Sequence, residues 1–293
     1  MSNIGFIGIG TMGFPMANNL IRNNHTVSFF DPYTNKTNEL IKLGGLKTSS
    51  IKEVCDDKKF IISMLPIGKN VKDIALGSDG IISQPNKDLI YIDMSTILPS
   101  DSINISKALK DTGIRMCDAP VARLVNNAID GTLLIMVGGE KNDFEIIKPI
   151  LECMGSDVYH CGPSGSGSKM KIINNYMAIV SNIVTAETLS LVKKSGIDLN
   201  FAINLMSTTA AGKGHMNFSY PKKVLNNDIE PGFKNELALK DLKLALDHGI
   251  KEGIDLTTGK CILPIYEEAV NSKYKDLDWT AMYNFIKEKN KLD

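Results

Sequence analysis

A glycine pattern between an apolar run and a helix start constrains this chain more than any other feature. Residues 4–9, Ile-Gly-Phe-Ile-Gly-Ile, are typical of a buried strand, and a GxGxxG pattern overlaps their end. In this pattern the first glycine permits a tight turn, the second lets backbone approach a pyrophosphate, and the third lets helix pack on strand. The helix N-terminus attracts the phosphates. The turn predicted to bind them comprises Gly8, Gly10, Thr11, Met12 and Gly13.

A second predicted strand, residues 26–30, leads into Asp31, 18 residues beyond Gly13. A carboxylate at this position accepts hydrogen bonds from ribose hydroxyls and repels a 2′-phosphate. No arginine follows closely, although Lys36 lies nearby. The pattern therefore predicts NAD(H) rather than NADP(H), with the alternative that Asp31 is only a turn residue before Pro32.

Strands and helices continue to alternate as far as residue 161. Further strands are expected at 60–65, 89–94, 114–118, 132–137 and 157–161, and helices at 34–43, 50–55, 69–76, 100–111 and 142–154. This alternation predicts an α/β Rossmann fold with a doubly wound parallel sheet, which binds ligands outside the C-terminal strand ends. Leu65, Pro66, Ser95 and Thr96 follow two such ends and are expected to line the nicotinamide half of the cleft. Pro66 could equally be a plain strand stop.

From Gly165 onward the sequence is helical in pattern, and the Val- and Ile-rich runs disappear. Helices are expected at 166–195, 198–207, 236–252, 257–272 and 279–290. The sequence thus predicts a dinucleotide-binding domain at 1–163 and an all-α domain at 164–293. Mostly apolar helices in the second domain favour a homodimer or homotetramer over a monomer.

Composition excludes several partners. The formal net charge is zero, so no overall field attracts nucleic acid or an anionic membrane, and an anion must be captured locally. No apolar run reaches ~18 residues without a polar interruption, and no signal peptide is recognised. The five cysteines lack CxxC spacing, which predicts reduced thiols in a cytoplasmic protein. No cluster with ligand spacing indicates a metal.

The helix expected from residue 166 brings three polar side chains to one face. Lys171, Asn174 and Asn175 share that face, with Gly167 one turn earlier. The surrounding residues are apolar, so burial on most sides is expected. A lysine held there either pairs with an acid or takes part in chemistry. This stretch alone leaves both interpretations open.

Four ordered motifs follow the glycine turn and carry a family resemblance. They are Asp118-Ala119-Pro120-Val121, Gly131-Thr132-Leu133, Gly165-x-Gly167-x3-Lys171-x2-Asn174-Asn175 and Lys240-Asp241-Leu242. Together they resemble the β-hydroxyacid dehydrogenase family, which includes 3-hydroxyisobutyrate dehydrogenase. The resemblance covers essentially the whole chain and implies a substrate bound between the two domains. It also implies that Lys171 is the catalytic acid/base, that Asn175 orients the substrate, and that Lys240 lines the far wall of the cleft beside cofactor and substrate.

The chemistry is consistent with these roles. Hydride transfer from nicotinamide to an aldehyde carbon leaves negative charge on the carbonyl oxygen, which a nearby ammonium can stabilise and protonate. Burial would lower the lysine pKa towards the working pH. A non-catalytic dinucleotide-binding scaffold is the alternative from another class, and the presence of Lys171 argues against it.

The loop after Val121 departs from the wider family. Family members have Ser-Gly-Gly there, whereas this chain has Ala122-Arg123-Leu124, with one of its three arginines. An arginine supplies several donors and a permanent charge to an oxyanion. Its alternative is a solvent-facing loop residue.

The sulfolactaldehyde reductase branch of the family resembles this chain more closely. The similarity includes the Arg123 loop and the stretch from Thr209 to His215. It implies that Arg123, Asn174 and Lys171 meet the sulfonate and carbonyl of a small anionic aldehyde, with Ser95 also at the substrate. A 3-hydroxyisobutyrate, tartronate or succinate semialdehyde is the alternative, since arginine binds carboxylates equally well. Gly212-Lys213-Gly214-His215 is either a substrate-side loop or an ordinary flexible turn.

Overall fold

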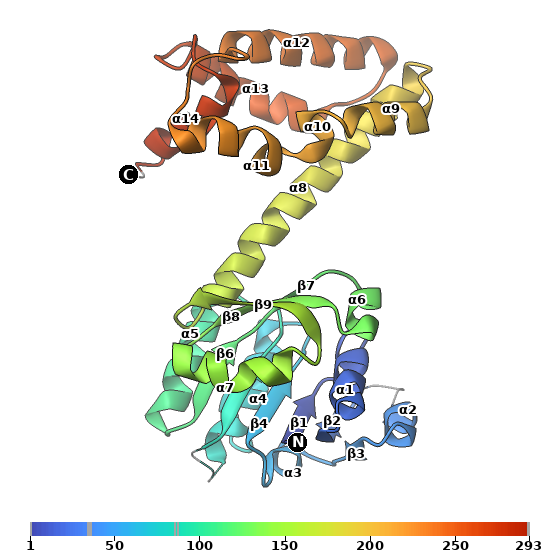
Figure 1. Ribbon diagram of the computed structural model, residues 1–293, viewed down its shortest axis with the longest axis vertical. Coiled ribbons are helices and arrows are strands. Elements are labelled where there is room, and N and C mark those ends of the chain that lie inside the picture. Colours follow the sequence, from blue (N-terminus) through green and yellow to red (C-terminus); the bar gives the residue numbers. More distant parts are fainter. Residues whose placement is uncertain (1, 34–36, 85, 87, 292–293) are drawn as a thin grey trace. The chain divides into compact units, whose positions relative to one another are not determined.

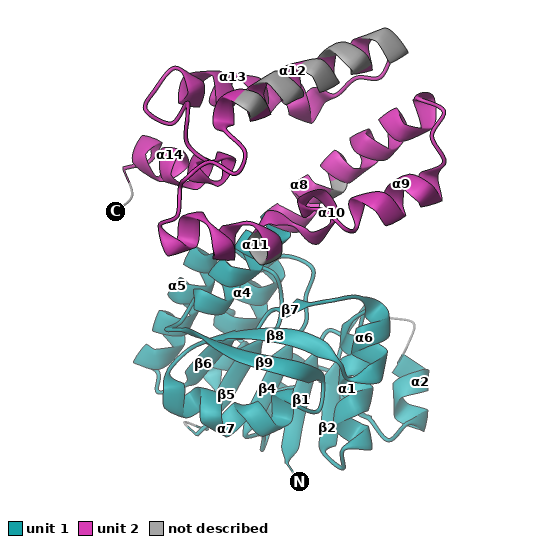
Figure 2. Ribbon diagram, turned by 45° about the horizontal axis from the view of Figure 1, so that its top comes forward, with its two compact units in different colours: residues 1–176 teal, residues 177–293 magenta. Residues whose placement is uncertain are grey.

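The computed structural model describes residues 2–33, 37–84, 86 and 88–291. Within helices it describes only the backbone at 182, 216–217, 237, 240–241, 244–245, 247–248 and 251–252. The chain divides into two compact units, residues Met1–Tyr176 and Met177–Asp293 (Figure 2).

Unit 1 is built on a nine-stranded sheet with the order β3-β2-β1-β4-β5-β6-β8-β7, in which β9 pairs with β8. The strands are β1 (Asn3–Ile7), β2 (Thr26–Phe30), β3 (Leu46–Lys47), β4 (Phe60–Ser63), β5 (Ile90–Asp93), β6 (Arg115–Asp118), β7 (Val121–Ala122), β8 (Leu133–Gly138) and β9 (Gly155–Gly162). All pairs from β3 to β6 are parallel, as is β8 with β9. The predicted Rossmann-like sheet is therefore confirmed.

Two details of the sheet differ from expectation. β8 runs antiparallel to β6 and to β7, because the chain reverses direction between β7 and β8, through residues 123–132. β3 and β7 were not predicted, since a two-residue strand is too short to show alternation.

Helices cover both faces of this sheet (Figure 1). They are α1 (Gly13–Arg22), α2 (Thr37–Lys42), α3 (Ile51–Cys55), α4 (Gly68–Leu76), α5 (Pro99–Asp111), α6 (Val125–Asp130) and α7 (Lys141–Leu151), with a 3-10 turn at Ile81–Ser83. The predicted helices are present with bounds that differ from expectation by at most three residues where they are described, and the start of the one expected at 34–43 lies outside the described residues. Sequence reasoning missed α6, which ends at Gly131 in the left-handed conformation.

Alternation along the strands creates two cores. Ile90 and Ile92 of β5 pack in one cluster with α1 residues such as Met16, whereas Tyr91 packs in the other with Val71 of α4. Burying one large apolar side chain stabilises the fold by roughly 1.5–3 kcal/mol. The same period of two places Asp93 on the face of Tyr91, at the C-terminal end of β5.

Unit 2 is helical, as expected. The long helix α8 (Ser166–Lys194) belongs to both units, and α9 (Leu199–Met206), α10 (Ala210–Lys213), α11 (His215–Phe218), α12 (Asn235–Glu252), α13 (Thr257–Val270) and α14 (Met282–Lys289) follow. Short 3-10 turns occupy Tyr220–Lys222, Val224–Asn226 and Trp279–Ala281. The division between units falls inside α8, after Tyr176. The domain boundary expected after residue 163 stays a prediction.

The single chain does not provide the burial that was expected around α8. Tyr176 is 71% exposed, Ile179 65% and Ile183 50%. The core cluster found among the described residues of unit 2 is small, with Ala269, Tyr274, Ala281 and Phe285 buried in it. No helix in the described part of the chain is long and apolar enough to cross a membrane.

Candidate active site

The glycine turn between β1 and α1 has the geometry that a pyrophosphate requires. Gly8 has a φ of 89°, and a Cβ there would lie 2.5 Å from the Met64 carbonyl oxygen. A Cβ on Gly13 would overlap the Gly8 carbonyl oxygen, so helix and strand could not approach as they do. A Cβ on Gly10 would meet no atom within 4 Å. The backbone is therefore closely packed at Gly8 and Gly13, whereas the space beside Gly10 is free. This arrangement leaves room for a phosphate group at the N-terminus of α1.

The carboxylate of Asp31 lies at the end of β2, beside the glycine turn. It accepts hydrogen bonds from the backbone N–H groups of Ile9, at 2.9 Å, and Tyr33, at 2.8 Å. The side chain is thereby fixed at the strand end where a ribose acceptor was expected. Its contact with ribose stays a prediction, and Lys36 lies outside the described residues.

A hydrogen bond joins the two loops expected to line the nicotinamide. The Leu65 N–H donates to the Ser95 hydroxyl at 2.9 Å. Ser95 is 1% exposed, whereas Pro66 and Thr96 on the same loops are exposed. The Ser95 hydroxyl thus stabilises the loop after β4, and its predicted contact with substrate stays a prediction.

Asp93 lies beneath these loops, and sequence reasoning missed it. Its fully buried carboxylate accepts from the Ser63 hydroxyl at 2.7 Å and from the Ser95 N–H at 3.2 Å. Burial raises the pKa of Asp93 to about 6, opposed by these donors. The available signal was an acid that ends an otherwise apolar strand.

Asp118, at the neighbouring strand end, holds the start of α8. Its two carboxylate oxygens accept from the N–H groups of Gly165 and Ser168, both at 2.7 Å. Burial raises the pKa of Asp118, and the two N–H bonds oppose that rise. A Cβ on Gly167 would overlap the Met136 carbonyl oxygen, so glycine is needed for this approach. Two of the motifs quoted above therefore meet and fix the helix that carries Lys171.

Lys171 lies on the second turn of α8 and is half-buried. Burial lowers the pKa of its ammonium, and no acid among the described residues forms an ion pair with it. The ion-paired interpretation therefore finds no partner in the described chain. Asn174 and Asn175 lie one turn further, with the Asn174 amide 3.4 Å from the Asn175 carbonyl oxygen. Their roles, and that of Lys171, stay predictions.

Arg123 follows β7 with a φ of 81°, and its guanidinium binds residues at the N-terminal ends of β8 and β9. Nη1 donates to the Thr132 carbonyl at 2.7 Å and to the Ser156 hydroxyl at 2.8 Å, and Nη2 pairs with Asp157 at 2.6 Å. The pKa of Asp157 is lowered by the Ser156 hydrogen bond and by Arg123. The Arg123 side chain is 36% exposed, so it is neither free in solvent nor fully enclosed.

Two parts of unit 2 were singled out from the sequence: Lys240 and the stretch Gly212–His215. Lys240 belongs to α12, but its side chain is outside the described residues. Gly214, with a φ of 79°, joins α10 to α11. His215 packs on Trp279 with centroids 4.5 Å apart, and Lys213 lies 5.1 Å from the Phe218 ring centroid. The stretch is therefore two short helices rather than an unstructured turn.

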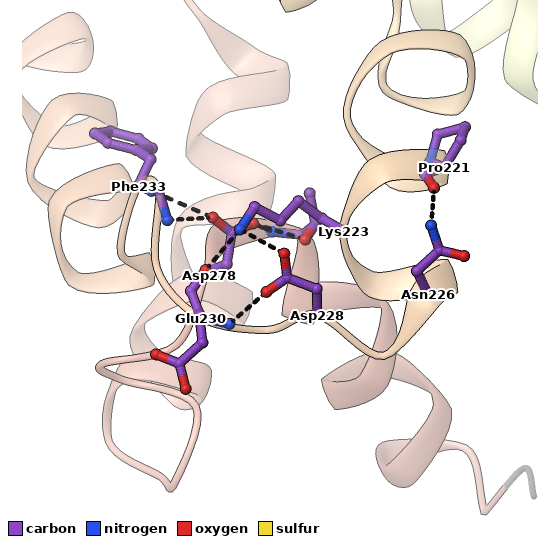
Figure 3. Close-up of polar contacts among 9 residues, drawn as sticks. Pro221, Lys223, Asn226, Asp228, Glu230, Phe233 and Asp278 are labelled. Atoms are coloured by element: carbon purple, nitrogen blue, oxygen red, sulfur yellow. Dashed lines mark hydrogen bonds and ion pairs between the residues drawn. The ribbon is translucent and has the colours of Figure 1, made fainter.

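Lys223, between the 3-10 turns Tyr220–Lys222 and Val224–Asn226, belongs to a polar network (Figure 3). Its ammonium pairs with Asp228 at 2.9 Å and donates to the Glu230 carbonyl at 3.0 Å. Nearby, buried Asp278 accepts from the N–H groups of Gly232 and Phe233. These contacts fix the loop before α12, which gives Lys223 a structural role in unit 2.

A surface pocket of unit 1 lies away from the candidate active site. A polar depression of about 610 Å³ is lined by Asn3, Lys59 and Arg115, at the opposite, N-terminal strand ends. Since α/β sheets bind ligands at the C-terminal ends, we do not assign it to the cofactor. No group of three or more potential metal ligands occurs among the described residues.

Comparison with known proteins identifies the family of both parts of the chain. Residues 3–162 match the NAD binding domain of 6-phosphogluconate dehydrogenase, and residues 165–286 match the NAD-binding domain of NADP-dependent 3-hydroxyisobutyrate dehydrogenase. The chain belongs to the β-hydroxyacid dehydrogenase family. It is therefore an NAD-dependent oxidoreductase that acts on CH–OH groups, and a non-catalytic scaffold is not supported.

Three relatives cover nearly the whole chain. The 3-sulfolactaldehyde reductase of Escherichia coli K12 is 37% identical over 287 residues, 98% of this chain and 96% of the relative. Mouse mitochondrial 3-hydroxyisobutyrate dehydrogenase is 32% identical, over 97% of this chain and 87% of the relative. The solved Mycobacterium tuberculosis 3-hydroxyisobutyrate dehydrogenase with L-serine is 30% identical, with a TM-score of 0.69 and coverage of 98% and 99%.

Proposed function

We propose that this β-hydroxyacid dehydrogenase reduces 3-sulfolactaldehyde to 2,3-dihydroxypropane-1-sulfonate with NADH, in sulfoquinovose degradation. The observation that carries the proposal is Arg123, fixed beside β8 and β9 in a loop where the wider family has small residues. The 37% identity with the Escherichia coli 3-sulfolactaldehyde reductase supports the same choice of substrate.

In this proposal Lys171 is the general acid. NADH, when bound, would supply the hydride for the aldehyde carbon, and the Lys171 ammonium would donate its proton to the carbonyl oxygen. Partial burial lowers the pKa of this ammonium, which makes it a better acid near neutral pH than a solvated lysine. Asn175 orients the substrate, and Asn174 contacts its polar groups one turn along the same helix.

Arg123 binds the sulfonate. Its observed contacts use three of the five guanidinium N–H groups, two on Nη1 and one on Nη2. The remaining Nε and Nη2 donors are available to a sulfonate oxygen. Asp157 already pairs with Nη2 of Arg123 at 2.6 Å. The sulfonate must therefore bind to a guanidinium whose charge is partly neutralised by the Asp157 carboxylate.

A carboxylate substrate is the second candidate. Arginine forms charge-assisted bonds with carboxylates as well as sulfonates. The curated and solved relatives include 3-hydroxyisobutyrate dehydrogenases, one of them solved with L-serine. The substrates to compare are therefore 3-hydroxyisobutyrate, L-serine, and tartronate and succinic semialdehydes.

The decisive experiment measures kcat/KM for NADH-dependent reduction of 3-sulfolactaldehyde and of the two semialdehydes, and for NAD-dependent oxidation of 3-hydroxyisobutyrate and L-serine. We expect the sulfonate to be preferred and Arg123→Ala to lower its kcat/KM by about 10- to 150-fold, since charge-assisted bonds contribute ~1.5–3 kcal/mol. A carboxylate preference that survives in Arg123→Ala would contradict the assignment.

Asp157→Asn is the matched variant. It keeps an acceptor-sized side chain beside Arg123 but removes the competing charge. If Arg123 binds the substrate anion, the KM for 3-sulfolactaldehyde should fall in Asp157→Asn and rise in Arg123→Ala. Equal KM values in all three proteins would leave Arg123 with a structural role only.

We also propose a homodimer or homotetramer and a cytoplasmic location. The exposed apolar side chains of α8 support assembly. The five cysteines are all free thiols, which favours a reducing compartment.

A further inference from the structure

The carboxylate of Asp93 is buried at the C-terminal edge of the sheet, on the strand next but one to β1. Ser63 of β4, Asp93 of β5 and Asp118 of β6 are register partners, so they end neighbouring strands in one row. Asp93 is 0% exposed. Burying an ionised carboxylate in such a position costs free energy, unless the group is protonated or a nearby donor or cation stabilises its charge.

With Asp93 ionised, the hydroxyl and N–H groups around it form a consistent series of donors. Ser63 has a single hydroxyl hydrogen and donates it to Asp93 at 2.7 Å. The Tyr91 hydroxyl, 2.7 Å from Ser63, must therefore be the donor in that pair. The Ser95 N–H is a further donor to the same oxygen. The other oxygen, Oδ2, has no hydrogen-bond partner among the described residues, so it has neither an acceptor for a proton nor a donor for its charge there.

This carboxylate is connected to both cofactor loops. Ser95, which donates its N–H to Asp93, accepts the Leu65 N–H on its hydroxyl. The loop after β4 and the loop after β5 are thereby joined above one buried charge. Ligands of a dinucleotide fold bind outside the C-terminal strand ends, and these are the two loops expected to line the nicotinamide half of the cleft.

Among the described residues, few ionisable groups lie near the Asp93 carboxylate. Tyr91 on its own strand has a pKa raised by burial and stays neutral. Asp118 on β6 is the acid that adds repulsion, and its own charge is met by the N–H groups at the start of α8. No basic side chain forms an ion pair with Asp93 in the described part of the chain. Its negative charge is therefore compensated only by dipoles, and it acts over a longer range in a low dielectric.

We propose that Asp93 is a positioning residue that sets the preference of the cofactor site for NAD+ over NADH. The nicotinamide ring is cationic in NAD+ and neutral in NADH, so a buried anion that has no cationic partner among the described residues would favour the oxidised form. This inference rests on the NAD site of the family and on no particular substrate. By reciprocity, NAD+ binding favours the ionised form of Asp93.

The test compares Asp93→Asn with wild type by measuring the Kd of NADH from its fluorescence and the Kd of NAD+ by competition. Asparagine keeps the oxygen that accepts from Ser63 and Ser95 but removes the charge. We expect NAD+ affinity to fall about tenfold at pH 7.5, while NADH affinity changes less than about twofold. Asp143→Asn, which removes a buried acid paired with Arg115, should leave the ratio unchanged.

A pH series separates charge from structure. Burial raises the pKa of Asp93 to about 6, so wild-type NAD+ affinity should fall as pH decreases through that value, with NADH affinity unaffected. Ser63→Ala removes a donor to the carboxylate and should move the midpoint upward. Equal weakening of both cofactors in Asp93→Asn, or a pH profile that Ser63→Ala does not move, would overturn the proposal. Failure of the wild type to bind either cofactor would instead contradict the NAD site itself.

Discussion

Lys171 loses part of its hydration without gaining a counterion among the described residues. Burial disfavours its charged form, and the pKa falls below that of a solvated lysine. An acid partner would have had the opposite effect and would have kept the ammonium charged. At the scale of single residues, this environment distinguishes a lysine suited to proton transfer from one that only stabilises a helix.

Lys171→Met tests this interpretation. Methionine is unbranched and only one atom shorter than lysine, but it cannot transfer a proton, so we expect kcat to fall by about 10²–10⁴-fold. NADH affinity should stay within about twofold of wild type, and thermal stability should not fall, because burial of the ammonium opposes folding. Steady-state kinetics, NADH fluorescence and a melting curve check these three outcomes.

The lowered pKa of Lys171 predicts how kcat changes with pH in each direction of the reaction. Reduction requires the protonated lysine, so its kcat should fall as pH rises through the lowered pKa of Lys171, whereas alcohol oxidation should rise over the same range. In Lys171→Met both limbs should disappear. Turnover that is unchanged in the variant would remove Lys171 from the mechanism.

At the scale of elements, α8 is placed by its first turn. Asp118 at the end of β6 accepts from Gly165 and Ser168, and Gly167 permits the approach of the helix to β8. Lys171 follows Ser168 by less than one turn, so any shift of this helix start would move the ammonium. The capping contact therefore connects the sheet of unit 1 to the proposed acid.

Asp118→Ala should release this helix start. Two buried N–H groups lose their acceptor, each at a cost of about 1–3 kcal/mol before water or relaxation compensates. We expect the Gly165 and Ser168 amides to exchange at least tenfold faster, measured by hydrogen exchange. Ser102→Ala is the control, since its buried hydroxyl has no hydrogen-bond partner among the described residues. Unchanged exchange at both amides would contradict the capping role.

The sequence predicted those features of the elements that depend on short-range pattern. The glycine turn, the alternating strands and the long helix all extend over fewer than about 30 residues, where periodicity is visible. The roles of Asp93, Asp118 and Asp157 were not predictable in this way. Asp118 binds amides 47 and 50 residues away, and Arg123 binds Ser156 33 residues away. Such contacts depend on which strand ends become neighbours, and that is set by the whole sheet.

At the scale of the whole molecule, apolar surface is distributed unevenly. Unit 1 buries two large clusters on either side of its sheet, whereas the described residues of unit 2 form one small core. α8 carries no charged residue from Ile172 to Ala186. Its large apolar side chains between Met170 and Val184 are exposed in the single chain, and such a continuous apolar surface is typical of a protein interface. This surface is the physical basis for the expected homo-oligomer.

Light scattering after gel filtration tests the assembly. We expect wild type to have a mass of two or four times 32.1 kDa. Ile179→Glu places a charge on a residue that is 65% exposed in the single chain, and it should shift the mass towards the monomer. Ile250→Glu is the matched control, because Ile250 is 67% exposed on α12 and lies outside α8. It should keep the wild-type mass. If Ile179→Glu assembled as the wild type does while Ile250→Glu dissociated, α12 rather than α8 would carry the interface; a wild-type monomer would contradict assembly altogether.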